Sequence, residues 1–163
     1  MYLTNNKLVL GIILLALISL VIQSCEEEGN SNPGQISFIL DGNPISYEDD
    51  DIVFRRHSPG RMEITSFAGE LYPIVNIDYS DDAEVGIKYD LSKPFNGIFG
   101  TLLETPSEAY ISSFGPEDSG ELEFTSITAD RVIGTFFFVG KEEVTETETR
   151  TITNGTFNVP LHQ

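Results

Sequence analysis

Side chains able to carry out acid–base or nucleophilic chemistry are few in this chain. Its two histidines are His57, in a segment typical of a turn, and His162, next to the last residue. A serine nucleophile needs a histidine and a third group placed around it, and no G-x-S-x-G motif is present. No neighbour in the sequence supplies a partner for His57, so we expect an exposed loop histidine. We predict no catalytic residue, no cofactor and no enzyme activity.

Carboxylates are numerous, with 26 acidic residues in 163, so pairs at glycosidase spacing would arise by chance. The set Asp78, Asp81, Asp82 and Glu84 could place several oxygens around calcium. It lacks the EF-hand spacing and central glycine, and a solvated acidic loop is the alternative that we favour. Because zinc motifs such as H-E-x-x-H are also absent, we predict no metal site.

Three arginines, Arg55, Arg56 and Arg61, surround one predicted turn. Guanidinium groups bind carboxylates and phosphates well, so this cluster could hold an anionic ligand. The acidic run Glu48–Asp51 directly precedes it in the sequence. We therefore expect the arginines mainly to offset these neighbouring negative charges.

The strongest chemical signal is Cys25, the single cysteine of the chain. A short polar start with one cation, an apolar run over residues 8–22 and a small residue before the cysteine have the layout of a secretory signal. The segment Ile22–Cys25, IQSC, resembles the bacterial lipobox. That resemblance implies lipid attachment to the Cys25 thiol and cleavage before it, so we predict a signal peptide over residues 1–24.

A transmembrane anchor is the alternative interpretation of the same segment. Its 15 apolar residues would form a helix of ~22 Å at ~1.5 Å per residue, against ~30 Å of bilayer hydrocarbon. Glu26–Glu28 follow the run, where a spanning helix often has basic residues. Both observations favour a cleaved signal, with acyl chains on Cys25 as the membrane anchor.

Composition limits the partners of the remaining chain. Residues 25–35 are typical of a flexible acidic tether, and residues 36–163 have the usual size of one domain. Removal of residues 1–24 takes away Lys7 and no acid, so the formal charge changes from −17 to −18. This charge disfavours nucleic acid as a partner. We expect a protein of the cell envelope, lipid-anchored at the outer membrane; the acidic run after Cys25 resembles a surface-export signal, with a solvated linker as the alternative.

Strand signals recur along the predicted domain, and no helical period is found. Short alternating segments are separated by Gly, Pro, Asn and Asp, at the spacing of an antiparallel β-sandwich or barrel. About ten strands are predicted, near residues 36–40, 45–47, 51–55, 61–68, 72–79, 87–91, 109–114, 120–128, 131–139 and 150–159. Asp41-Gly42 predicts a hairpin turn, and residues 98–103 could be a strand or a short helical turn.

The segment 131–139 is apolar on both faces, which predicts a central strand. Its alternation places Phe136 and Phe138 on one face and Phe137 on the other. We expect the first two to face the main core, with Phe157 packed near them.

In the last predicted strand the inward-facing positions change parity at Asn154-Gly155. This predicts a bulge with a left-handed glycine or a two-residue turn. The segments IGTFFF at 133–138 and ITNGTFNV at 152–159 resemble a family of Bacteroidetes lipoproteins of unknown function. The resemblance covers mainly residues 86–161, and it implies a β fold and a lipoprotein, without an activity to carry over.

Three hypotheses about function follow. The first, which we prefer, is a non-catalytic, lipid-tethered binding or accessory module with an unknown ligand. The second is a calycin-like carrier of a small apolar ligand, suggested by eleven Phe residues. The third is a hydrolase with paired carboxylates. An internal apolar cavity would favour the second, two convergent carboxylates in a cleft the third, and a filled core the first.

Overall fold

The computed structural model describes residues 33–57, 60–67, 72–93 and 97–161. The predicted signal peptide, Cys25 and His162 lie outside these residues. No helix among the described residues is long and apolar enough to cross a membrane. The strands are β1 (Gln35–Leu40), β2 (Asn43–Glu48), β3 (Ile52–Arg56), β4 (Arg61–Ser66), β5 (Ile74–Ser80), β6 (Lys88–Asp90), β7 (Phe99–Thr105), β8 (Glu108–Ile111), β9 (Gly120–Ile127), β10 (Arg131–Glu142) and β11 (Thr149–Pro160).

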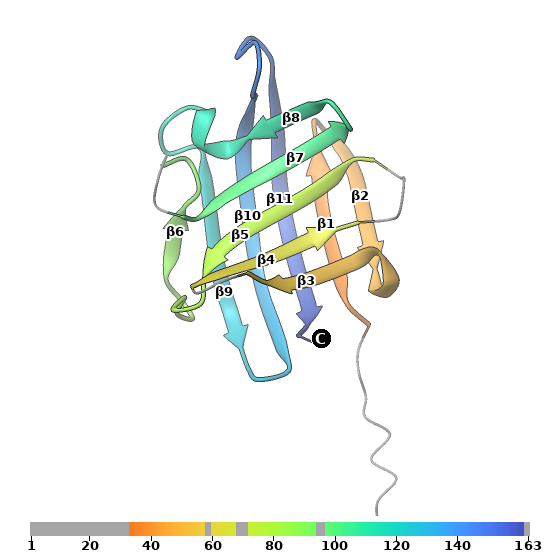
Figure 1. Cartoon of the computed structure of the whole chain (residues 1–163), viewed down its shortest axis with the longest axis vertical. Helices are drawn as coiled ribbons and strands as arrows, with labels where there is room; N and C mark the ends of the chain where they lie inside the picture. Colours follow the sequence, from red (N-terminus) through yellow and green to blue (C-terminus); the bar gives the residue numbers. More distant parts are fainter. Residues whose placement is uncertain (1–32, 58–59, 68–71, 94–96, 162–163) are drawn as a thin grey trace, which may run out of the picture. The chain divides into compact units, whose positions relative to one another are not determined.

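These strands form one antiparallel sheet. Nine of them follow the order β2-β1-β11-β10-β8-β7-β5-β4-β3, and β9 pairs with β10 and with β6 beside this path. The edge strands β2 and β3 are consecutive in the chain and joined by the short turn η1 (Asp49–Asp51). The sheet therefore curls back on itself into a nearly closed, barrel-like fold, which confirms the predicted all-β class. Figure 1 shows β3, β4, β5, β7 and β8 crossing in front of β1, β9, β10 and β11.

Strand β10 makes the bend between the two layers. Residues Val132–Phe138 pair with β9, whereas Lys141 and Glu142 pair with β8. A strand that pairs with both layers lets a twisted sheet turn a corner without breaking. The prediction that this segment is central is therefore confirmed.

Local sequence explains two other connections. Asp41 and Gly42 both have positive φ, and Leu40 pairs with Asn43 across them, as in the two-residue turn that favours Asp-Gly. The ambiguous segment at 98–103 belongs to strand β7, with Leu102 fully buried.

Strands β10 and β11 pack through reciprocal glycine–phenylalanine pairs. Gly134 lies opposite Phe157, and Phe136 lies opposite Gly155. A Cβ on Gly134 would be 2.4 Å from the ring of Phe157, and one on Gly155 would be 2.7 Å from the ring of Phe136. Each ring thus occupies the space that a side chain on the facing strand would take. The sequence G-T-F, which occurs in both strands, reflects this packing.

The parity change in β11 is a bulge, since the register between β10 and β11 shifts after Phe136. Asn154, with φ of 51°, adopts the left-handed conformation. Our expectation that Gly155 would adopt it is wrong. Gly155 is required for a different reason, because a Cβ there would lie 2.5 Å from the carbonyl oxygen of Phe136.

Aromatic rings fill the inside of the barrel. Phe124, Phe138 and Phe157 are at most 1% exposed. Phe136 also faces inward, with its ring centroid 6.4 Å from that of Phe157, as predicted. Phe137 is on the outer face and is 40% exposed. Side chains therefore occupy the space in which an interior carrier would hold its ligand.

Candidate functional site

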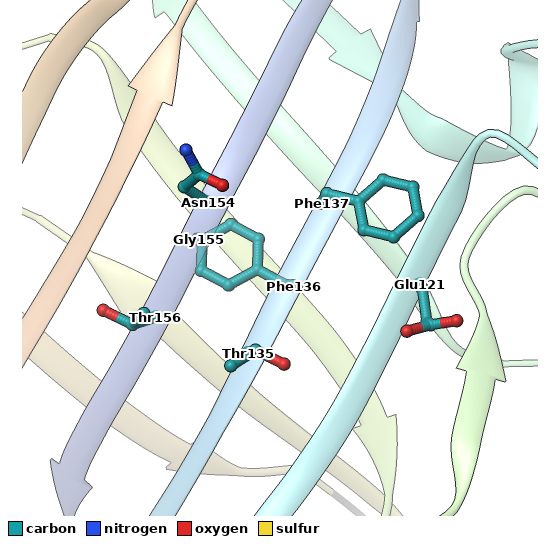
Figure 2. A pocket seen from close by; sticks show the side chains of 7 residues that line it. All are labelled: Glu121, Thr135, Phe136, Phe137, Asn154, Gly155 and Thr156. Atoms are coloured by element: carbon teal, nitrogen blue, oxygen red, sulfur yellow. The ribbon is translucent and has the colours of Figure 1, made fainter.

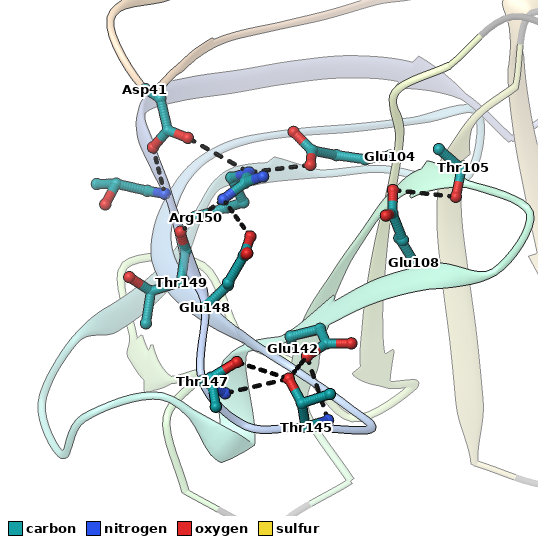
Figure 3. Close-up of polar contacts among 11 residues, drawn as sticks. Asp41, Glu104, Thr105, Glu108, Glu142, Thr145, Thr147, Glu148, Thr149 and Arg150 are labelled. Atoms are coloured by element: carbon teal, nitrogen blue, oxygen red, sulfur yellow. Dashed lines mark hydrogen bonds and ion pairs between the residues drawn. The ribbon is translucent and has the colours of Figure 1, made fainter.

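One end of the barrel is held together by a cluster around Arg150, near the start of β11. Its guanidinium is 2.9 Å from Glu104 of β7 and 3.6 Å from Asp41 in the β1–β2 turn. Its central carbon lies 4.7 Å from the centre of the Tyr110 ring on β8. Figure 3 shows the carboxylates gathered around the guanidinium. The hydrogen bond to Glu104 raises the pKa of Arg150, so this link between strands stays charged.

The other end of the barrel, beside the end of β11, has a hollow of about 280 Å³ that we name the mouth. Arg56, Met62 and Tyr79 line it from β3, β4 and β5. The register pairs Arg56 with Met62 and Met62 with Tyr79, so the three form one row. Across the hollow lie Val132 and Leu161.

Polar side chains without partners distinguish the mouth. The hydroxyl of Tyr79, a residue only 3% exposed, has no hydrogen-bond partner among the described residues. Within the described ranges, neither the guanidinium of Arg56 nor the carboxylate of Asp81 forms an ion pair or a side-chain hydrogen bond, although both residues line the hollow. By contrast, Arg61 and Arg150 are each paired with a carboxylate. The mouth thus holds exposed groups of both charges that have no protein partner among the described residues, beside a buried hydroxyl that also lacks one.

The free hydroxyl leads to a prediction for Tyr79→Phe. Burial raises the pKa of Tyr79, so the hydroxyl remains protonated, and a buried unpaired polar group costs ~1–3 kcal/mol. We expect this variant to keep or increase the free energy of unfolding, by up to ~1 kcal/mol, in urea denaturation. A loss of more than ~1 kcal/mol would show that the hydroxyl has a stabilising partner in solution.

A second polar cluster lies on the outer face of the front strands. The Nε2 atom of His57 is 2.5 Å from Oε2 of Glu63, and the Thr65 hydroxyl donates a hydrogen bond to the other carboxylate oxygen. Burial raises the pKa of Glu63, but the hydrogen bonds from His57 and Thr65 outweigh it, and the pKa lies below its ordinary value. The expectation that His57 lacks a partner is wrong, because the pairing of β3 with β4 brings Glu63 beside it.

Asp78, on the neighbouring strand β5, is directly opposite Glu63 in the register. Arg61 donates a hydrogen bond from Nε to its Oδ1 atom at 2.6 Å. Burial raises the pKa of Asp78 more than Arg61 lowers it. The expectation that Arg61 offsets Glu48–Asp51 is therefore wrong, since its partner comes from the adjacent strand.

The fold also separates the residues of the predicted acidic loop from one another. Asp78 belongs to β5 and faces Arg61, whereas Asp81 follows that strand and lines the mouth. In the part of the chain that the structure describes, no three His, Asp or Glu side chains are placed to hold a metal ion.

Another hollow, of about 360 Å³, lies on the outer face of β9, β10 and β11. Figure 2 shows Phe137 and Glu121 on one side of it and Asn154 on the other. Glu121 is already paired with Lys88 at 2.9 Å. Since its lining contains no other charged residue, this hollow offers less chemistry for recognition than the mouth.

The chain thus forms a small barrel-like β domain. The ion pairs of Arg150 connect the strands at one end, and the mouth lies at the other end. Comparisons with models of known families, with characterised proteins and with solved structures found no match. The function must therefore be argued from the residues of this chain. Sequence reasoning singled out Arg56 and Asp81 but did not place them in one site with Tyr79, because only the strand register brings them together.

Proposed function

We propose that this chain is a lipid-anchored protein of the cell envelope whose β domain is a non-catalytic binding module. The observation that carries the proposal is the mouth, a hollow lined by a guanidinium and a carboxylate that are unpaired among the described residues and by a buried hydroxyl that has no partner there either. Binding sites typically combine an apolar surface with a few polar groups that orient the ligand. The lipobox-like segment before Cys25 and the resemblance to Bacteroidetes lipoproteins support the anchor.

The state of the carboxylates supports a binding role over hydrolysis. Glycosidases need two carboxylic groups that face a common substrate. Glu63 and Asp78 are adjacent, but each is occupied, by His57 and by Arg61 respectively. Neither lines the mouth or the hollow on the outer face. A hydrolase would leave at least one of them free toward a cleft.

The packing of the interior supports a binding module over an interior carrier. A calycin-like carrier keeps a cavity inside the barrel, whereas Phe124, Phe138 and Phe157 fill the centre of this one. The mouth is also smaller than most pockets for drug-sized ligands, which begin at ~300 Å³. We therefore assign binding to the open end of the barrel and to a small ligand.

The anchor is tested by Cys25→Ala in cells grown with labelled palmitate. The thiol is the site of lipid attachment in this proposal, so we expect complete loss of the label and an uncleaved or soluble precursor. Ser24→Ala, which keeps a small residue before the cysteine, should retain both the label and the cleavage. Unchanged labelling of the Cys25→Ala protein would overturn the lipoprotein assignment.

A further inference from the structure

The mouth presents opposite charges on two sides. Arg56 ends β3, and Asp81 follows β5, where its backbone N–H donates a hydrogen bond to the carbonyl of Gly60 at 3.1 Å. Among the described residues the two side chains form no ion pair with each other or with any other group. Each is therefore available to a ligand, the guanidinium for a carboxylate and the carboxylate for a cation.

Apolar side chains line much of the hollow, and Ile127 is 38% exposed. Leu161 and Ala83 are partly buried and pack against the hydrophobic core. Met62 and Val132, which are 7% and 1% exposed, belong to that core. A short hydrocarbon group bound here would remove apolar surface from water, a gain of ~25 cal/mol per Å².

The pair of opposite charges favours a ligand that is neutral overall. A net anion would meet Asp81 and the repulsion of a domain with a large negative charge, while a simple cation would meet Arg56. A ligand that carries both charges and is neutral overall avoids both penalties. It would also satisfy the two unpaired groups at once.

We propose that the mouth binds a zwitterion with a short apolar side chain, which is the chemistry of a free hydrophobic amino acid. The inference rests on the proposed function as a binding module and names its ligand class. The carboxylate of the ligand pairs with Arg56, and its ammonium group pairs with Asp81. The side chain lies against Ile127 and Leu161, the more accessible apolar residues of the lining.

The test is equilibrium dialysis of labelled L-leucine with the full-length protein as it is purified. Two competitors each lack one charge: 4-methylpentanoate has no ammonium group, and 3-methylbutylamine has no carboxylate. We expect leucine to bind and each competitor to bind at least ~10-fold more weakly, because a charge-assisted hydrogen bond contributes ~1.5–3 kcal/mol.

Substitutions of Arg56 and Asp81 test whether these two side chains bind the charged groups of leucine. Arg56→Gln and Asp81→Asn should each weaken leucine binding at least ~10-fold. The controls Arg55→Gln and Asp82→Asn change the net charge equally, but their residues do not line the mouth. They should stay within ~2-fold of the unmodified protein, as expected for exposed charges outside the site.

The outcomes separate this inference from the proposed function. If 4-methylpentanoate binds as tightly as leucine, the mouth is a ligand site but the zwitterion inference is wrong. If neither leucine nor the competitors bind, or if Arg56→Gln equals Arg55→Gln, both the inference and the assignment of binding to the mouth are overturned. The lipid anchor is tested separately, by the palmitate labelling of the Cys25→Ala protein, and does not depend on these results.

Discussion

Replacing Phe136 with alanine is expected to remove most of the stability of the domain. The side chain is 2% exposed, and its ring centroid lies 6.2 Å from that of Phe38 and 6.4 Å from that of Phe157. Truncation of a buried Phe costs ~3–5 kcal/mol through lost burial and the cavity left behind. Domains of this kind have ~5–15 kcal/mol in total. The urea midpoint of the variant should therefore fall sharply.

The adjacent residue is the control for this prediction. Phe137 has the same side chain on the same strand, but it points to the outer face and is 40% exposed. Its replacement by alanine should cost only ~1 kcal/mol, because surface positions outside special contacts have small effects. Equal losses in the two variants would contradict the assignment of faces in β10.

A second large effect is expected for Arg61→Gln. Asp78 is 3% exposed and depends on Arg61 as its positively charged partner. Removal of one member of a buried ion pair leaves an uncompensated charge and costs ~3–5 kcal/mol. Arg61 is itself half exposed, so we expect a loss of ~3 kcal/mol near neutral pH, at the lower end of that range. Arg55→Gln, which removes an arginine that forms no ion pair with the residues the structure describes, should cost far less.

The pH dependence of this loss has a definite sign. Burial raises the pKa of Asp78, so the folded state holds this proton more tightly than the unfolded chain does. The corresponding stability is present at low pH and is lost as pH rises through the folded pKa. Without Arg61 the pKa rises further, so the cost of Arg61→Gln should grow as the pH rises through the folded pKa of Asp78.

A double variant completes the test. Asp78→Asn removes the buried charge, so the double variant with Arg61→Gln should recover much of the stability that Arg61→Gln loses. Urea midpoints of the two single variants and the double variant give the coupling between the residues. A cost of Arg61→Gln that is independent of pH and is not reduced by Asp78→Asn would overturn the role assigned to this pair.

Much of the fold could be predicted because strands have a period of two residues. The alternation in residues 131–139 separates Phe136 and Phe138 from Phe137, and the structure keeps that separation. Asp41-Gly42 predicts its turn because few residue pairs tolerate positive φ at both positions. These features are local, so nearby residues are sufficient to specify them.

Contacts between strands were decided by register, which local patterns do not encode. The partners of His57, Arg61 and Asp78 come from neighbouring strands, and for this reason the expectations for His57 and Arg61 were wrong. The same holds for Gly134 and Gly155, whose G-T-F segments are visible in the sequence, although the need for glycine appears only when a ring from the facing strand fills the space.

The candidate site likewise combines features that the sequence predicts with contacts that only the strand register creates. The sequence predicts Cys25 as the point of lipid attachment, because the signal-like segment directly precedes the cysteine. It also shows that Arg55, Arg56 and Arg61 cluster near a turn. The alternation of β3 then directs Arg55 outward and Arg56 toward the mouth, and the pairing of β3, β4 and β5 aligns Arg56 with Tyr79. Residues more than twenty positions apart become neighbours only when the strands pair, and so only the tertiary structure decided where the proposed site lies.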